Sequence, residues 1–358
     1  MIPVEVHTNS AYTYGSSTPN EGVAALRTPL RRRSCTVYMV YHQTGVHMIV
    51  TVTMNPSIDT RYSLDTLTLD DVNRVQAHKT AGGKGINVAR VLQELGSDVR
   101  AMGLAGGCMG VLLEKLMDAD GTPHEFTHIA GETRTCVAVL HEGKQTELLE
   151  AGPEVANDEL EAFTSAFARA LAQAEVVTMS GSLPRGVDPR YYVQLIKEAH
   201  KQHVPVLLDT SSPALDYALE SDVKPFLIKP NLSEVNAMLH TSFTPNELHQ
   251  LADTIEADAR FVGISWVVIS MGKDGLFALH NGKRLRLYVA PISAVNATGS
   301  GDSTIAGFAY ALTKQKDPIE VLKYGATCGT LNALEAKTGY INCNNWAKIY
   351  DGCRVEEL

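Results

Sequence analysis

The sequence predicts an α/β protein with a doubly wound, mostly parallel sheet flanked by helices and a second, smaller β-sheet. From residue 157 onward, amphipathic helical segments alternate with short, continuously apolar strands such as EVVTMSG and WVVISMG. Strands that are apolar throughout are buried on both faces, which is typical of parallel sheets covered by helices. Residues 60–80 and 134–155 instead alternate between polar and apolar side chains, as strands with one exposed face do. They predict the smaller sheet, with strands at about 60–80 and 134–150.

The composition suits one large domain preceded by an extension. The chain has 358 residues, 44% of them apolar, six cysteines without a CxxC pair, and a net charge of −9. Residues 1–47 carry four arginines against two glutamates, which is +2 and leaves −11 for 48–358. An acidic body argues against nucleic acid as a partner, and no apolar run approaches the length of a membrane span. We expect a cytoplasmic protein with a poorly ordered extension at 1–47 and a single domain at 48–358.

The first predicted strand, MIVTVTM at 48–54, is followed by a candidate ligand-binding acid. Asn55, Pro56 and Ser57 end the strand, and Asp59 comes shortly after it. Ligands of open α/β sheets bind beyond the carboxyl ends of the strands, so Asp59 is placed to accept hydrogen bonds from hydroxyl groups. An aspartate that caps a turn is the alternative explanation.

A first glycine turn, AGGKGINVARVLQELG at 81–96, enters a helix that ends before Gly96. It is not a Walker A loop, because that motif needs Ser or Thr after the Gly-Lys pair, and Gly85 follows Lys84 here. The glycines let a ligand approach the backbone, and Lys84 and Asn87 are spaced to reach its oxygens. A glycine bend with a solvated lysine would leave the same pattern.

A second glycine turn, SAVNATGSGDSTIAGFAYAL at 293–312, leads most directly to chemistry. Glycines and small residues run up to Asp302, and apolar residues then recur at helical spacing. The free amides and dipole of a helix N-terminus attract anions, and Gly299 and Gly301 have no side chain to keep a phosphate away. Asp302 is either a helix-capping acid or a base beside the bound anion, able to take the proton of an attacking hydroxyl.

Three shorter motifs add candidate residues. Arg134 leads into a predicted hairpin at 134–155, and an arginine fork suits a pair of phosphate oxygens. A surface arginine without a ligand is the alternative explanation. In KPNLSE, Asn231 and Glu234 have the spacing of a capping box, while Lys229 and Glu234 also suit phosphate charge and Mg²⁺. SMGKDG at 270–275 predicts a turn at the end of a strand. It is a candidate for contact with a nucleotide, and a plain turn explains the pattern equally well.

These motifs together resemble the ribokinase-like superfamily of sugar kinases, also called the PfkB family. The resemblance runs from Met48 to the C-terminus and rests on TMNPSID, AGGKGINVARVL, SGSLP, KPNLSE, SMGKDG and NATGSGD in that order. NPSID with GGKGINVAR is similar to the phosphosugar branch that contains tagatose-6-phosphate kinase and 1-phosphofructokinase. The ending YGATCGTLNALEAKTGYIN is most similar to tagatose-6-phosphate kinase.

The resemblance implies that ATP with Mg²⁺ phosphorylates O1 of a ketohexose phosphate, tagatose 6-phosphate, to give the 1,6-bisphosphate. It also implies a β lid, which often forms a homodimer interface in the family. The implied site residues are Asp302 as base; Gly299, Ser300 and Gly301 as anion hole; Asp59, Gly82, Gly83 and Asn87 for sugar hydroxyls; Lys84 and Arg134 for the phosphate already on the sugar; Lys229, Asn231, Ser270, Gly272, Gly275 and Gly301 for the nucleotide; and Glu234 for Mg²⁺.

Two other functions fit the same residues. Fructose 1-phosphate, phosphorylated at O6, also offers a ketohexose and one phosphate. A non-catalytic sugar-phosphate sensor would keep the ligand residues and lose the base, and the retention of Asp302 after GSG argues against it. The chain departs from the family pattern in the 47-residue extension, in DTSS at 209–212 in place of DTSG, and in Met271 where leucine is common.

Overall fold

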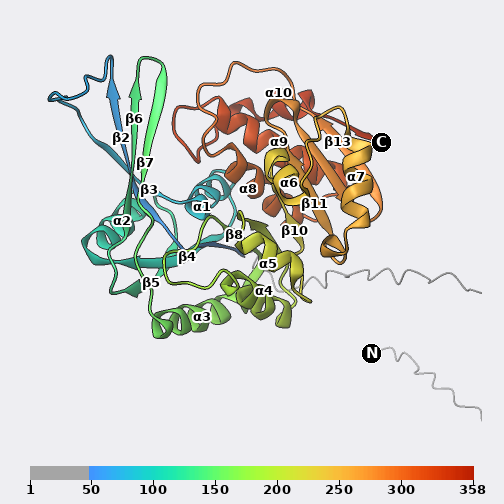
Figure 1. Ribbon diagram of the computed structural model, residues 1–358, viewed down its shortest axis with the longest axis horizontal. Coiled ribbons are helices and arrows are strands. Elements are labelled where there is room, and N and C mark those ends of the chain that lie inside the picture. Colours follow the sequence, from blue (N-terminus) through green and yellow to red (C-terminus); the bar gives the residue numbers. More distant parts are fainter. Residues whose placement is uncertain (1–47) are drawn as a thin grey trace, which may run out of the picture. The chain divides into compact units, whose positions relative to one another are not determined.

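The main element of the fold is a ten-stranded sheet, seen in a computed structural model that describes residues 48–358 (Figure 1). The predicted extension at 1–47 lies outside the described residues. In spatial order the strands are β14 (Arg354–Glu357), β13 (Lys283–Tyr288), β12 (Leu276–His280), β11 (Trp266–Ser270), β10 (Leu227–Ile228), β9 (Val206–Asp209), β8 (Ala174–Ser180), β1 (Met48–Thr53), β4 (Val99–Gly106) and β5 (His124–Ile129). In this order the strands from β11 to β5 are parallel to their neighbours, whereas β12, β13 and β14 extend the sheet in antiparallel fashion.

Helices cover both faces of this sheet, as the doubly wound prediction requires. Every residue of the apolar strand β1 is buried; Val50 and Val52 pack into one hydrophobic core and Ile49 into another on the opposite face. The first core takes residues from α3 (Asn157–Leu171), α4 (Tyr191–Lys201), α5 (Ala214–Glu220), α6 (Leu232–Leu239) and α7 (Leu248–Ala257). The second takes residues from α1 (Lys84–Glu94), α2 (Gly107–Ala119), α8 (Ser300–Thr313), α9 (Pro318–Ala333) and α10 (Trp346–Gly352). Within 48–358, none of these helices has the length and apolar character needed to cross a membrane.

A separate four-stranded sheet, called the small sheet below, lies beside α1 and α2 (Figure 1). Strands were predicted at about 60–80 and 134–150; residues 65–77 of the first range form neither helix nor strand. Glu142 and Gly143 form the turn between the last two strands of this sheet along the chain. Its strands, in spatial order, are β3 (His78–Gly82), β2 (Ser57–Leu64), β6 (Arg134–His141) and β7 (Lys144–Leu149).

The parallel sheet gathers polar residues at one edge. Asp209 is the last residue of β9, Lys229 follows β10, and Ser270 ends β11, and these three strands are neighbours. Because parallel strands end at the same edge of a sheet, side chains distant in sequence meet there. The chain also passes from β1 to β2 at this edge, through Asn55, so the small sheet begins beside it.

Candidate active site

A cavity of about 890 Å³ lies at this edge, bounded by the small sheet and the N-terminus of α8. Most residues predicted for the site line it, although they come from segments far apart in the sequence. They are Asp59, Gly83, Lys84, Asn87, Arg134, Lys229, Asn231, Glu234, Ser270, Gly299, Gly301 and Asp302. Four predicted residues do not line it: Gly82, Gly272, Gly275 and Ser300.

Asp302 lies in the first turn of α8 and is nearly buried, with 6% of its surface exposed. Asn87 Nδ2, from α1, donates a hydrogen bond of 2.8 Å to Asp302 Oδ2. The helix begins at Gly299, whose φ of 84° is in the left-handed region, and a Cβ there would lie 2.7 Å from Thr338 Cγ2. The tight glycine turn therefore presents the helix N-terminus and the carboxylate to the same space.

The surroundings of Asp302 keep its carboxyl group near its titration point at neutral pH. Burial, and next the charge of Asp209, raise its pKa to about 7, against the opposing effects of the Asn87 hydrogen bond, Lys84 and Lys229. A carboxylate with such a pKa exchanges protons readily at neutral pH, as general-base catalysis requires. The capping explanation fails on one point, since the Asp302 side chain accepts from Asn87 rather than from a backbone amide of its own helix.

Asp209 holds two lysines at the base of the cavity and is a site residue that the sequence analysis did not select. Lys229 Nζ lies 3.3 Å from Asp209 Oδ1, and Lys84 Nζ lies 3.9 Å from Asp209 Oδ2. The charge of Asp209 is the main reason that the pKa of Lys84 is raised, so this lysine stays charged. Asp209 ends the apolar stretch PVLLD at 205–209, and the strand-end rule that selected Asp59 would also have found it.

Asp59 lies within β2 rather than in a turn. Ser57 Oγ donates to Asp59 Oδ1 at 2.6 Å, and burial raises the pKa of the Asp59 carboxyl. Gly82, its neighbour on β3, makes room for this side chain: a Cβ at residue 82 would lie 2.2 Å from the Asp59 carboxyl carbon. Gly82 therefore acts on the site through Asp59, although it does not line the cavity.

Arg134 lies in the cavity wall with its guanidinium largely engaged by the protein. Nη1 donates to the carbonyl of Glu150 at 2.9 Å, and Nη2 donates to the carbonyl of Asn55 at 3.0 Å. These carbonyls belong to two of the segments that connect the small sheet with the main sheet. Nε is buried without a hydrogen-bond partner among the described residues. Arg134 thus links the segments that contain Asn55 and Glu150, independently of any contact with a ligand.

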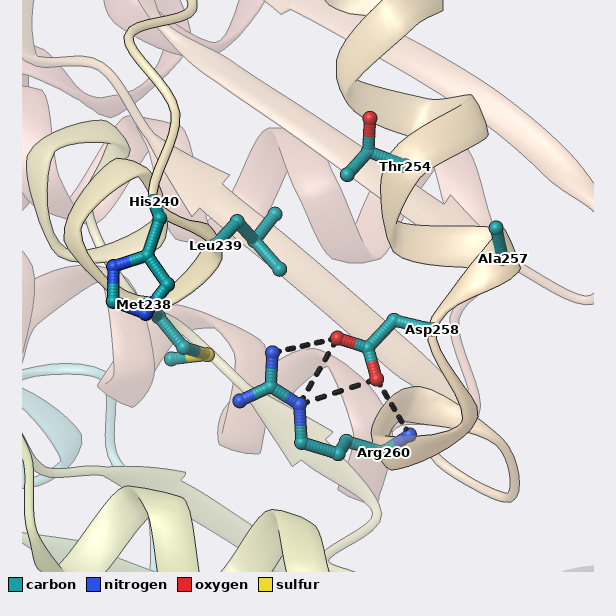
Figure 2. A pocket seen from close by; sticks show the side chains of 7 residues that line it. All are labelled: Met238, Leu239, His240, Thr254, Ala257, Asp258 and Arg260. Atoms are coloured by element: carbon teal, nitrogen blue, oxygen red, sulfur yellow. Dashed lines mark hydrogen bonds and ion pairs between the residues drawn. The ribbon is translucent and has the colours of Figure 1, made fainter.

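A second hollow, of about 380 Å³, lies between the C-terminal ends of α6 and α7 (Figure 2). Its charged residues, Asp258 and Arg260, bind each other through several hydrogen bonds, the shortest 2.6 Å from Nη2 to Oδ2. None of the predicted site residues lines it. The larger cavity is therefore the candidate active site.

Residues 51–345 match the pfkB family of carbohydrate kinases. The chain belongs to this family. Phosphofructokinase-2 from Escherichia coli, in complex with fructose-6-phosphate, is similar at 26% identity and a TM-score of 0.76, over 86% of this chain and 98% of that one. Its tetrameric inhibited form is similar at 26% identity and a TM-score of 0.75, with the same coverage. A possible 1-phosphofructokinase from Thermotoga maritima is 25% identical, with a TM-score of 0.75, over 87% of this chain and 100% of that one.

PfkB sugar kinases use ATP with Mg²⁺, and the cavity suits this donor. Lys229 lies close to the N-terminus of α8: a Cβ on Gly301 would lie 3.3 Å from Lys229 Nζ. A positive charge therefore lies beside the free backbone amides of this helix. Amides and a lysine are the groups that bind transferring phosphates in kinases. Within 48–358 no group of three or more His, Cys, Asp or Glu side chains is arranged to hold a metal ion. In phosphoryl-transfer sites Mg²⁺ is usually held by phosphate oxygens, water and one or two carboxylates.

Glu234 would reach such an ion through water, and its main contacts in the structure are those of the predicted capping box. Asn231 Oδ1 accepts from the Glu234 amide at 2.9 Å, and Glu234 Oε2 accepts from the Asn231 amide at 2.8 Å. Asn231 and Glu234 also line the cavity. A capping role and a role near the nucleotide and Mg²⁺ are therefore compatible with each other. Gly272 and Gly275 instead shape the turn after β11; a Cβ on Gly275 would lie 2.1 Å from the Leu287 carbonyl oxygen.

Proposed function

We propose that this sugar kinase transfers the γ-phosphoryl group of ATP to O1 of tagatose 6-phosphate. The observation that carries the proposal is the placement of Asp302: a nearly buried carboxyl with a pKa of about 7, in the first turn of α8 and facing a cavity with two lysines. The substrate follows from the phosphosugar motifs NPSID and GGKGINVAR and from the C-terminal sequence, which resemble tagatose-6-phosphate kinase.

The chemistry follows from these positions. Asp302 takes the proton of the attacking hydroxyl, and Asn87 holds the carboxylate in place through its 2.8 Å hydrogen bond. The amides at Gly299 to Gly301 and the Lys229 ammonium stabilise charge on the transferring group, which Mg²⁺ also neutralises when bound. Asp59 binds sugar hydroxyls, and Lys84 and Arg134 bind the phosphate that the sugar already carries. The small sheet excludes water that would compete for the phosphoryl group.

Two other acceptors share this chemistry. The similar Escherichia coli enzyme was solved with fructose-6-phosphate, which offers the same O1 as tagatose 6-phosphate. The Thermotoga maritima protein is described as a possible 1-phosphofructokinase, whose substrate offers O6 and carries its phosphate at the other end. Either acceptor would use Asp302 as base, so the choice changes only how the sugar lies in the cavity.

The deciding experiment is ADP release with Mg²⁺·ATP and each of tagatose 6-phosphate, fructose 6-phosphate and fructose 1-phosphate, compared as kcat/KM. The proposal expects the highest value with tagatose 6-phosphate. A higher value with either fructose phosphate would reassign the substrate and keep the base. Binding of all three without ADP release would instead identify a sugar-phosphate sensor.

Replacing Arg134 by alanine is expected to raise KM for the sugar phosphate about tenfold, since a charged hydrogen-bond donor near the phosphate is lost. KM for ATP should stay within about twofold. The connections to the small sheet also lose two hydrogen bonds, so thermal unfolding of the variant is measured alongside. If both KM values rise together, Arg134 serves only to tie Asn55 to Glu150.

The small sheet is also the proposed homodimer interface. Leu148 and Leu149 at the end of its edge strand β7 are each 63% exposed, and apolar side chains on an exposed strand edge favour pairing with another chain. Sedimentation should give twice the chain mass, and the Leu148→Glu variant should give the mass of one chain. A dimer that survives the substitution places the interface elsewhere.

A further inference from the structure

Asn87 lies between a group that only accepts hydrogen bonds and one that only donates them. Its Nδ2 donates to Asp302 Oδ2 at 2.8 Å, and its Oδ1 accepts from Arg90 Nη1 at 3.1 Å. A carboxylate has no donor and a guanidinium has no acceptor, so only this orientation of the amide satisfies both neighbours. The amide also has little room to find another partner, because the residue is 8% exposed and a Cβ at Gly339 would lie 2.8 Å from its oxygen.

Arg90 is itself held at every guanidinium nitrogen. It follows Asn87 by three residues on α1, so both side chains lie on the same face of that helix, and only 7% of the Arg90 side chain is exposed. Nε donates to Asp120 Oδ2 at 2.9 Å, and Nη2 donates to the carbonyl oxygen of Ala81, near the end of β3. A planar group with all three nitrogens bound cannot turn away from Asn87 without breaking several hydrogen bonds.

Asp120 has a place that helix preferences do not explain. It caps the C-terminus of α2, where the helix dipole disfavours a negative charge. A buried guanidinium needs an anion, and Asp120 supplies one while remaining 30% exposed. Its other oxygen, Oδ1, lies 3.5 Å from Lys337 Nζ. A continuous chain of contacts thus leads from Asp120 through Arg90 and Asn87 to Asp302.

We propose that Arg90 is a positioning residue for the base, and that it keeps the Asn87 amide in the orientation that favours the ionised carboxylate of Asp302. This inference rests on the proposed function and adds to it a residue that acts through Asn87. A protonated carboxyl group needs an acceptor, and Arg90 occupies the Asn87 oxygen that would serve as one. Without Arg90 the amide could turn and accept from protonated Asp302, so both protonation states would find a partner.

Removing Arg90 should therefore make Asp302 harder to ionise. Burial, and next the charge of Asp209, raise the pKa of Asp302 to about 7. The groups that oppose this rise are Asn87, Lys84 and Lys229, and all of them remain in the Arg90→Met variant. A hydrogen bond gained by the protonated form should move the midpoint of the pH profile upward by about one pH unit.

The test is the pH dependence of kcat/KM for tagatose 6-phosphate in the wild type and in Arg90→Met. The expected value for the variant is about tenfold lower at pH 6 and within about twofold of the wild type at pH 9, where Asp302 is ionised in both. Arg100→Met is the matched control: it removes from β4 an arginine that binds a carboxylate, Glu125, at 3.5 Å, and should leave the profile unchanged.

A second variant covers the case in which Arg90→Met does not fold. Arg90→Lys keeps a charge beside Asp120 but has no planar fork to bind Asn87 and Ala81 as well, and we expect a shift in the same direction. Thermal unfolding of each variant shows which of them is folded. An unchanged profile in a folded variant would overturn the proposal.

The charge of Arg90 could also act on the cavity without Asn87, and a second background separates the two effects. Burial raises the pKa of the Asp59 carboxyl while the charges of Arg90 and Arg134 oppose the rise, so the substitution also reaches Asp59. In Asn87→Ala only such charge effects remain, and adding Arg90→Met should move the titration of Asp302 no further. An equal shift in both backgrounds would overturn the positioning role and make Arg90 a source of charge alone.

Failure of the proposed function is recognised separately. The titration of Asp302 can be followed without substrate by NMR of isotope-labelled aspartate, with Asp302→Asn to assign the signal. A higher midpoint in Arg90→Met, in a protein that turns over no ketohexose phosphate, would keep the effect of Arg90 on Asp302 and overturn the kinase function. Turnover with an unchanged Asp302 titration would keep the kinase function and overturn the role of Arg90.

Discussion

Replacing Asp302 by asparagine is expected to lower kcat by about 10³-fold, within the range that general-base catalysis contributes. Asparagine has nearly the same shape and keeps an oxygen for the hydrogen bond from Asn87, but it has no affinity for the proton of the attacking hydroxyl. The amides of α8 and Lys229 stay in place. ATP binding, measured by calorimetry, should therefore remain within a few-fold of the wild type. Near-normal turnover would end the assignment of Asp302 as base.

The wild-type pH profile gives an independent check on the same carboxyl group. Because the pKa of Asp302 is raised to about 7, the base is protonated below that pH. The value of kcat/KM for the acceptor should rise with pH and level off above about 7 to 8. A profile that is flat from pH 5 to 8 would show that ionisation of Asp302 does not limit the reaction.

The stability of the Asp302→Asn variant distinguishes a lost base from a damaged fold. An acid whose pKa is raised by folding destabilises the folded state once it ionises, so its cost grows from about pH 4 to pH 7 and persists above. Asparagine removes this cost. At pH 8 the variant should be more stable than the wild type by an amount on the order of 2 kcal/mol, and the difference should vanish below pH 4. A variant less stable at pH 8 would indicate lost packing instead.

Local sequence patterns were sufficient for the fold and for much of the site. The apolar stretch MIVTVTM at 48–54 predicts a buried strand, and β1, which is buried along its whole length, is one. The glycine turns before Lys84 and Asp302 predict helix N-termini, and α1 and α8 begin there. Both features depend on residues close together in the chain, where backbone preferences decide the structure.

The contacts that complete the site could not be predicted in the same way. Asp209 matters because two lysines, one 125 residues before it and one 20 residues after it, meet at its carboxylate. Arg134 looks like a free phosphate ligand in the sequence, yet its terminal nitrogens donate to carbonyls of Asn55 and Glu150. A sequence pattern gives the residue type and the face of a strand, whereas these partners depend on how distant segments pack.

Substitution of Gly82 is expected to impair sugar binding, because this glycine affects the site through one neighbouring side chain, that of Asp59. The Gly82→Ala substitution is expected to lower kcat/KM for the sugar phosphate by about 100-fold, mainly by raising KM, with KM for ATP unchanged. A Cβ at this position would lie 2.2 Å from the carboxyl group of Asp59, so the carboxylate must leave its place. The backbone of Gly82 is not in the left-handed region, which makes the clash with Asp59 the main source of strain.

A double-mutant cycle separates this explanation from a general disturbance of the small sheet. If Gly82→Ala acts by displacing Asp59, then adding it to Asp59→Asn should cause little further loss, because the group it displaces has already lost its charge. Additive losses would mean that the alanine disturbs the turn from β3 into α1, including Gly83 and Lys84. The non-additive result would place Asp59 at the centre of sugar binding and make Gly82 the residue that allows an aspartate to lie there.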